Sequence, residues 1–148
     1  MPAELGDRML EARGTTEINR SPEEIFDYLS DMRNEPLWLP GAADIRLTSD
    51  GEVGRDSTFE GTYARAGPVK CSISRHQRPG QLTIHGEGKG MTFDDEVTLT
   101  ATTVGTRLDA VMRTQPKGLF KLFAPMMGRI IGKQFQGNWD NLKRVLES

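Results

Sequence analysis

The carboxy-terminal segment, residues 118–147, constrains the fold more than any other stretch of the sequence. Its apolar residues recur at steps of three and four positions, which is the spacing of one broad buried face on a long helix. They are Phe120, Phe123, Met127, Ile131, Phe135, Trp139, Leu142 and Leu146. A helix from Pro125 to the end of this segment would be about 33 Å long, roughly the width of a small domain. The rest of the chain must therefore supply a surface for this helix to cover.

Most of the preceding chain is typical of short strands. Residues 9–19 alternate in character, and the even positions from Leu10 to Ile18 are predicted to face the core. From residue 43 onward the alternation recurs between turns such as Asp50-Gly51 and Arg78-Pro79-Gly80. Turns at this spacing predict an antiparallel meander.

Two short helices are predicted between the first and second strands. Ser21 is a good N-cap, Pro22 suits the first helical position, and Glu24 can close a capping box. The sequence Asn34-Glu35-Pro36 stops this helix, and a second helix or turn carries Leu37-Trp38-Leu39. The predicted fold is therefore α+β: a seven-stranded, curved antiparallel sheet with two short helices after the first strand and the long helix across its concave face. Because one helix cannot fill such a face evenly, we expect a gap between helix and sheet.

The order of these motifs resembles that of the START-like, or SRPBCC, superfamily of polyketide cyclase/dehydrase and lipid transport proteins, which have the helix-grip fold. The resemblance covers residues 8–147. The residues that carry it are the capped Ser21-Pro22-Glu23-Glu24-Ile25-Phe26 with Leu29, then Trp38-Leu39-Pro40, Gly86 and Gly88, Val104-Gly105-Thr106-Arg107-Leu108, and the terminal amphipathic helix. It implies a cavity between helix and sheet that binds a largely apolar small molecule. The superfamily also includes enzymes, toxins and chaperone activators, so the fold does not choose among these activities.

The composition is ordinary for a soluble, globular protein. We expect a single domain over residues 1–148, with a flexible N-terminus at residues 1–7. Charged residues make up 27% and hydrophobic residues 36% of the chain. The chain starts without a basic, apolar signal segment, and a single cysteine, Cys71, suits a reducing compartment, so we expect a cytoplasmic protein. The sequence lacks zinc-type Cys and His spacing and a basic patch interleaved with aromatic residues. We therefore expect no metal, no cofactor and no nucleic acid partner.

Strand parity selects the residues that should line the cavity. The expected lining is Trp38, Phe59, Tyr63, Cys71, Arg75, Asp95, Leu99, Met112, Met127, Ile131, Phe135 and Trp139. Asp95 shares the parity of Val97 and Leu99, which places a carboxyl group on an apolar face, where its pKa would be raised. Asp95 and Tyr63 are the candidates for acid–base work. The alternatives are that Asp95 is exposed at the sheet rim and that Tyr63 is an ordinary core residue.

Several other polar residues are candidates for the site or are excluded from it by their parity. Arg75 continues the inward parity of Ile73 and would reach a ligand carboxylate or pair with Asp95, unless it extends to water. His76 and His85 fall on the outward parity, which argues against a histidine dyad or metal site. On the long helix, Gln134 and Asn138 flank the apolar stripe and offer polar contacts.

The start of the long helix has its own irregularities. Pro125 should break the helix and leave residues 119–123 as a separate turn. We expect the apolar Leu119, Phe120 and Phe123 there to form a gate over the cavity, a transient membrane or protein contact, or a fixed plug. Gly128 and Gly132 weaken the helix, which predicts either a close approach to a strand or space for a ligand.

Three functions follow as hypotheses. The first is binding of a hydrophobic small molecule, lipid-like or polyketide-like, between the sheet and the long helix. The second is a cyclase or dehydratase in which Asp95 and Tyr63 act on a bound carbonyl compound. The third is a protein-interaction or toxin-like module that works through the apolar segment. The sequence leaves enzymatic activity, ligand identity and oligomeric state open.

Overall fold

The computed structural model describes residues 9–148, with the side chain of Met127 outside the description. The predicted terminus at 1–7 lies outside the described residues. The elements are β1 (Leu10–Ile18), α1 (Pro22–Ser30), η2 (Met32–Asn34), α2 (Glu35–Trp38), β2 (Ala43–Leu47), β3 (Thr58–Tyr63), β4 (Gly67–Gln77), β5 (Gln81–Gly88), β6 (Met91–Thr102), β7 (Gly105–Pro116), η3 (Gly118–Phe123) and α3 (Ala124–Glu147). This order confirms the predicted α+β helix-grip fold.

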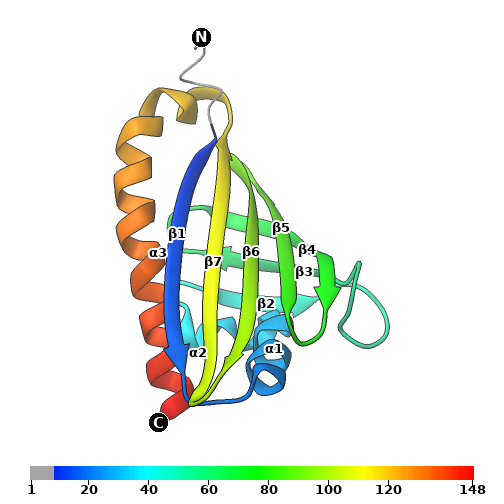
Figure 1. Ribbon diagram of the computed structural model, residues 1–148. Helices are drawn as coiled ribbons and strands as arrows, with labels where there is room; N and C mark the ends of the chain where they lie inside the picture. The colour runs from blue at the N-terminus through cyan, green and yellow to red at the C-terminus, as the bar shows by residue number, and fades with distance from the viewer. Residues whose placement is uncertain (1–8) are drawn as a thin grey trace.

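All seven strands form one antiparallel sheet in the order β1-β7-β6-β5-β4-β3-β2. The strands β1, β7 and β6 run along the molecule, whereas β2, β3 and β4 lie across it, so the sheet curls around its concave side (Figure 1). α1 and α2 close one end of this curl, and α3 runs beside β1. The even positions of β1 from Ala12 to Ile18 are buried, as predicted.

The start of α1 follows from its sequence. The Ser21 hydroxyl accepts a hydrogen bond from the backbone N–H of Glu24 at 3.2 Å, and Pro22 occupies the first turn. This capping bond satisfies one of the amide groups that a helix start leaves without a partner. The helix then buries Ile25, Phe26 and Leu29 against the sheet. These side chains belong to the hydrophobic core.

α3 is joined to the edge strand β1 by polar bonds as well as by packing. Gln136 accepts a hydrogen bond from the Thr15 N–H at 3.0 Å and donates one to the Thr15 carbonyl at 2.8 Å. Lys143 donates to the Glu17 carbonyl at 2.7 Å, and Glu147 accepts from the Asn19 N–H at 2.8 Å. These side chains satisfy backbone groups of β1 and the residue after it that face away from β7.

One close approach fixes the distance between α3 and β1. A Cβ atom at Gly14 would lie 2.6 Å from Cδ1 of Trp139, so glycine lets the indole ring lie against the strand. The helix glycines behave differently. A Cβ at Gly128 would make an ordinary contact with Leu10, and one at Gly132 would meet nothing within 4 Å. Close packing therefore explains the glycine on the strand, but it does not explain those on the helix.

The irregular start of α3 follows the prediction. Residues 118–123 form the separate 3₁₀ turn η3, and Pro125 lies in the first turn of α3, where its missing N–H leaves no bond unmade. No helix within residues 9–148 is long and apolar enough to cross a membrane.

Candidate functional site

Two adjoining chambers lie between the sheet and the helices. The inner chamber has a volume of about 210 Å³ and lies among α1, α2, the concave side of the sheet and α3. The outer chamber has a volume of about 520 Å³ and extends beneath η3. The two share seven lining residues from the β3–β4 turn, β6, β7 and α3: Arg65, Ala66, Met91, Met112, Gln134, Phe135 and Asn138. Because these residues belong to both walls, the two chambers are direct neighbours.

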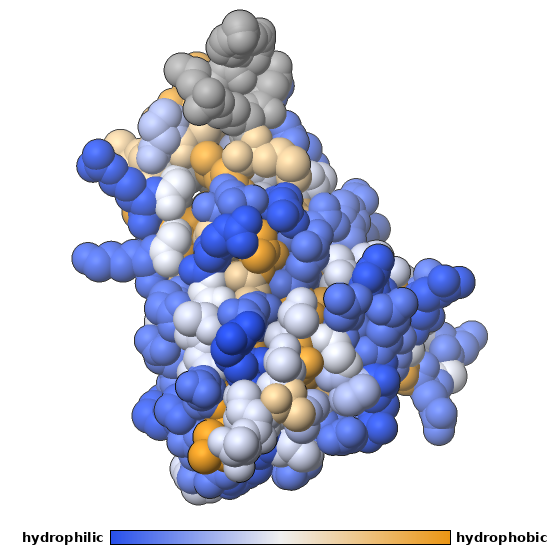
Figure 2. Space-filling view, viewed as in Figure 1, coloured by the Kyte–Doolittle hydropathy of each residue, from blue (hydrophilic) through white to orange (hydrophobic). Residues whose placement is uncertain are grey.

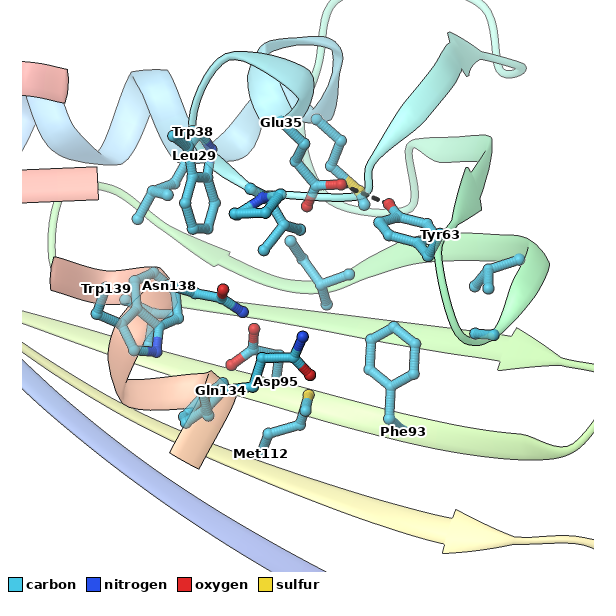
Figure 3. Close-up of a pocket in the computed structure, with 18 of the residues that line it drawn as sticks. Leu29, Glu35, Trp38, Tyr63, Phe93, Asp95, Met112, Gln134, Asn138 and Trp139 are labelled. Carbon is cyan, nitrogen blue, oxygen red and sulfur yellow. Dashed lines mark hydrogen bonds between the residues drawn. The ribbon is translucent and has the colours of Figure 1, made fainter. Parts of the chain in front are cut away.

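α2 places a buried carboxyl group in the inner chamber. Glu35 is the first residue of this short helix, and its carboxylate accepts a hydrogen bond from the Tyr63 hydroxyl of β3 (Figure 3). Burial raises the pKa of Glu35 from its ordinary 4.5 to about 7, the Tyr63 bond opposes that rise, and the charge of Asp95 adds to it. At neutral pH a substantial share of Glu35 is therefore protonated.

β6 supplies the second carboxyl group. Asp95 lies opposite Ile84 of β5 and Met112 of β7 in the sheet, and it points into the inner chamber (Figure 3). Its Oδ1 atom is buried and has no hydrogen-bond partner. Burial raises the pKa of Asp95 from 3.8 to about 7, and the neighbouring charge of Glu96 contributes further. A buried acceptor without a partner is unusual and marks a place where a ligand atom can bind.

Tyr63 and Cys71 are not activated for chemistry as bases or nucleophiles. Burial and the nearby Glu35 charge raise the pKa of the Tyr63 hydroxyl, so this group stays protonated and acts as a donor. Burial also raises the pKa of the Cys71 thiol to about 12. Since only a thiolate is an effective nucleophile, Cys71 is inert.

Aromatic rings form the end wall of the inner chamber. The indole rings of Trp38 and Trp139 stack at 5.3 Å between ring centroids, and Phe135 meets Trp139 edge-on at 5.6 Å. Asn141 of α3 donates a hydrogen bond to the Trp38 carbonyl, which ties α2 to α3. The stacked rings therefore lie on two helices that are joined to each other by a hydrogen bond.

The outer chamber is closed at one end by η3. The side chains of Phe120 and Phe123 line it together with Ile130 and Ile131 of α3. The Phe120 ring lies over the β5–β6 turn, where a Cβ at Gly90 would come within 2.6 Å of the ring. The absence of a side chain at Gly90 thus lets the Phe120 ring pack against this turn at the end of the outer chamber.

The structure brings together only part of the predicted lining. The inner chamber is lined by Trp38, Tyr63, Asp95, Met112, Phe135 and Trp139. Ile131 lines the outer chamber, and the side chain of Met127 lies outside the described part of the chain. Phe59, Cys71 and Leu99 do not reach either chamber. They are buried in the core, where neighbouring side chains cover them.

The predicted direction of Arg75 is wrong because β4 contains a bulge. The sheet register shifts between Ile73 and Arg75, so that Ser74 is the extra residue. A bulge of one residue reverses the alternation that follows it. Arg75 consequently lies on the outer face, where it donates to Gln81 at 2.7 Å.

The same bulge turns His76 inward, contrary to its predicted outward parity. Its ring meets Phe26 of α1 edge-on at 4.9 Å between ring centroids. His85 of β5 lies on the outer face, as predicted, where its Nδ1 is 2.9 Å from an oxygen of Asp94 on β6. Among the described residues, no group of three His, Cys, Asp or Glu side chains is placed to hold a metal ion.

Glu35 is not among the residues that the sequence patterns predict for the site. Its position before Pro36 indicates a helix stop, but the run Leu37-Trp38-Leu39 that follows Pro36 is unusually apolar for a solvated turn. That apolar context is the signal that indicates burial. Gln134 and Asn138, proposed as polar flanks of the stripe, do border both chambers.

A family model described as polyketide cyclase / dehydrase and lipid transport matches residues 9–147. The chain belongs to this family. The match spans nearly the whole sequence, and it confirms the resemblance to the START-like, or SRPBCC, superfamily. No curated protein matches the chain significantly.

Solved structures support the fold of this polyketide cyclase/dehydrase and lipid transport family member. The di-domain ARO/CYC StfQ from the steffimycin biosynthetic pathway aligns with a TM-score of 0.76 at 14% identity, over 97% of this chain and 53% of that one. Protein BH1534 of Bacillus halodurans aligns at 0.71 and 14% identity, over 94% and 98% of the two chains. Ara h 8.0201 aligns at 0.69 and 15% identity, over 95% and 99%. At these identities the similarity is one of fold.

Proposed function

We propose that this protein binds a hydrophobic small molecule that extends from the inner chamber into the outer one. The observation that carries the proposal is the inner chamber itself, a mostly apolar space that contains a buried carboxyl oxygen without a partner. The description of its family as polyketide cyclase / dehydrase and lipid transport supports a ligand of this class.

The chamber sizes limit how the ligand is arranged. A volume of about 210 Å³ is below the roughly 300–1,000 Å³ of common ligand sites, but a cavity of about 150 Å³ already holds benzene. The inner chamber therefore suits one ring or one short polar end. The outer chamber, with about 520 Å³, suits the apolar remainder of the molecule.

The two acids limit the charge of the polar end. A ligand hydroxyl group can donate to Asp95 Oδ1 and satisfy an acceptor that the protein leaves unpaired. A ligand carboxylate would instead place a negative charge beside Glu35 and Asp95, and like-charge repulsion opposes this whenever either acid is ionised. We therefore propose a neutral ligand with a hydrogen-bond donor, such as an alcohol or a phenol, in preference to a fatty acid.

Fluorescence titration with the neutral dye Nile red tests this proposal. We expect dye binding, displacement by dodecanol, and displacement by dodecanoate that is weaker by about 10- to 150-fold, since one lost or opposed hydrogen bond at a charged group is worth about 1.5–3 kcal/mol. The variant Ala66→Phe, which fills the shared wall of the chambers, should lose dye binding. The matched variant Ala101→Phe, on the exposed end of β6, should keep it. Equal dye binding by both variants would contradict the proposed site.

A second function, acid–base catalysis, is favoured by the pairing of Glu35 and Asp95 in one chamber. A carboxyl group with a pKa near 7 is suited to donate or accept a proton at neutral pH. We propose that these acids, with Tyr63 as a hydrogen-bond donor, move a proton next to a ligand carbonyl, as a cyclase or dehydratase requires. Solvent deuterium exchange into 2-undecanone, followed by NMR, measures this step. Exchange that is as fast with Asp95→Asn and Glu35→Gln as with the native protein would refute a catalytic role for them.

A further inference from the structure

An exposed apolar surface lies at the end of the molecule where the outer chamber is closed by η3. We call it the apical patch, and its described residues are Leu119, Phe120, Leu122, Phe123, Met126 and Ile130. Leu119 is 77% exposed and Leu122 is 75% exposed, so neither serves the core. Figure 2 shows apolar residues gathered at this end of the molecule, close to hydrophilic side chains that project from the α3 flank.

Basic residues alternate in the sequence with the residues of the apical patch. Residues 117–139 contain four basic residues and no acidic one, although the whole chain has a net charge of −2. The basic residues are Lys117, Lys121, Arg129 and Lys133. Lys89, in the β5–β6 turn, adds a further cation at the wall of the outer chamber. The stretch 117–139 therefore carries a net charge of +4, opposite in sign to that of the whole chain.

We propose that the apical patch binds the surface of an anionic lipid bilayer. Exposed leucine and phenylalanine side chains can enter the region between headgroups and acyl chains, while lysine and arginine beside them reach anionic headgroups. Each basic residue near such a surface strengthens binding by about fivefold. A neutral protein surface would use the apolar side chains but would offer no anionic groups to Arg129 and Lys133.

The geometry connects this surface to the outer chamber. Phe120, Phe123 and Ile130 belong to the apical patch and also line the outer chamber. A protein docked through the patch thus turns the chamber wall toward the bilayer. The inference goes beyond ligand binding and does not depend on it, because docking on a membrane needs only the surface residues.

Co-sedimentation with lipid vesicles tests the inference on the full chain without added ligand. We expect binding to vesicles of phosphatidylcholine mixed with phosphatidylserine, at least tenfold weaker binding to phosphatidylcholine alone, and loss of binding as salt is raised, because salt screens exposed charges. The double variant Leu119→Ser/Leu122→Ser should lose at least tenfold in binding. Its control is Val104→Ser, which replaces an equally exposed side chain, 65% exposed, in the β6–β7 turn.

A charge-reversal pair tests the electrostatic part. Arg129→Glu/Lys133→Glu should abolish the preference for phosphatidylserine, whereas Arg55→Glu in the β2–β3 loop should leave it unchanged. Equal binding to both vesicle types, or native binding by the leucine double variant, would overturn the inference. So would a dimer in solution that the leucine double variant abolishes, since a second copy would then cover the patch. Nile red binding measured without vesicles reports on the chambers separately, so the two proposals fail independently.

Discussion

Replacing Asp95 with asparagine should change how stability depends on pH. The pKa of Asp95 is raised from its ordinary 3.8 to about 7 in the folded protein. At 1.36 kcal/mol per pKa unit, this difference means that ionised Asp95 costs the folded state about 4 kcal/mol above pH 7. An asparagine side chain has nearly the same shape and carries no charge, so Asp95→Asn should remove this cost.

The sign of the pH dependence follows from proton binding. Between pH 3.8 and about pH 7 the folded state holds a proton on Asp95 that the unfolded state has released. The free energy of unfolding of the native protein therefore falls by about 1.4 kcal/mol per pH unit in this window because of Asp95. Glu35, raised from 4.5 to about 7, acts in the same direction and remains in the variant. The native protein should thus lose stability more steeply than the variant as pH rises.

Guanidinium unfolding followed by circular dichroism, at several pH values from about pH 5 to about pH 8, measures the difference. The advantage of Asp95→Asn should grow steadily up to about pH 7 and then level off. Asp50→Asn, in the exposed β2–β3 loop, is the control and should give no such growth. A constant difference between the native protein and Asp95→Asn at every pH would show that Asp95 is not a desolvated acid, and the reasoning on the inner chamber would fail.

Three further changes test the packing. Gly14→Ala should destabilise the protein by about 1–3 kcal/mol, because its Cβ would lie 2.6 Å from the Trp139 ring, and an unchanged urea midpoint would contradict this close approach. Gly132→Ala meets open space and should stabilise by up to about 1 kcal/mol through helix propensity, so a lower melting temperature would be the contrary result. Ser21→Ala should lose about 1 kcal/mol with the cap of α1, whereas Ser21→Asp should retain most of it in the same unfolding assay.

The fold was predictable because its signals are local and periodic. The cap at Ser21, the even positions of β1 and the stripe of α3 each follow from short-range rules, and they agree with one another. The separation of η3 from α3 was likewise predictable, because Pro125 cannot lie inside a continuous helix. Each of these signals can be found in the sequence without knowing which strands are neighbours in the sheet.

The site was less predictable because it depends on features that sequence alternation does not register. One extra residue, Ser74, reverses the directions of Arg75 and His76. The parity of a strand residue also predicts only which face of the sheet its side chain lies on. It does not distinguish a side chain covered by its neighbours, such as Leu99, from one that lines a chamber, such as Met112. Glu35 lies on a single helical turn, where neither the strand period nor the helix period has room to appear.

The bonds from α3 to β1 bear on whether another chain can pair with this edge of the sheet. A strand at the border of a sheet is a template on which another chain can add itself. Gln136, Lys143 and Glu147 occupy the backbone groups that such an addition would need. In addition to lining the chambers, α3 therefore hinders the addition of a further strand to the β1 edge of the sheet.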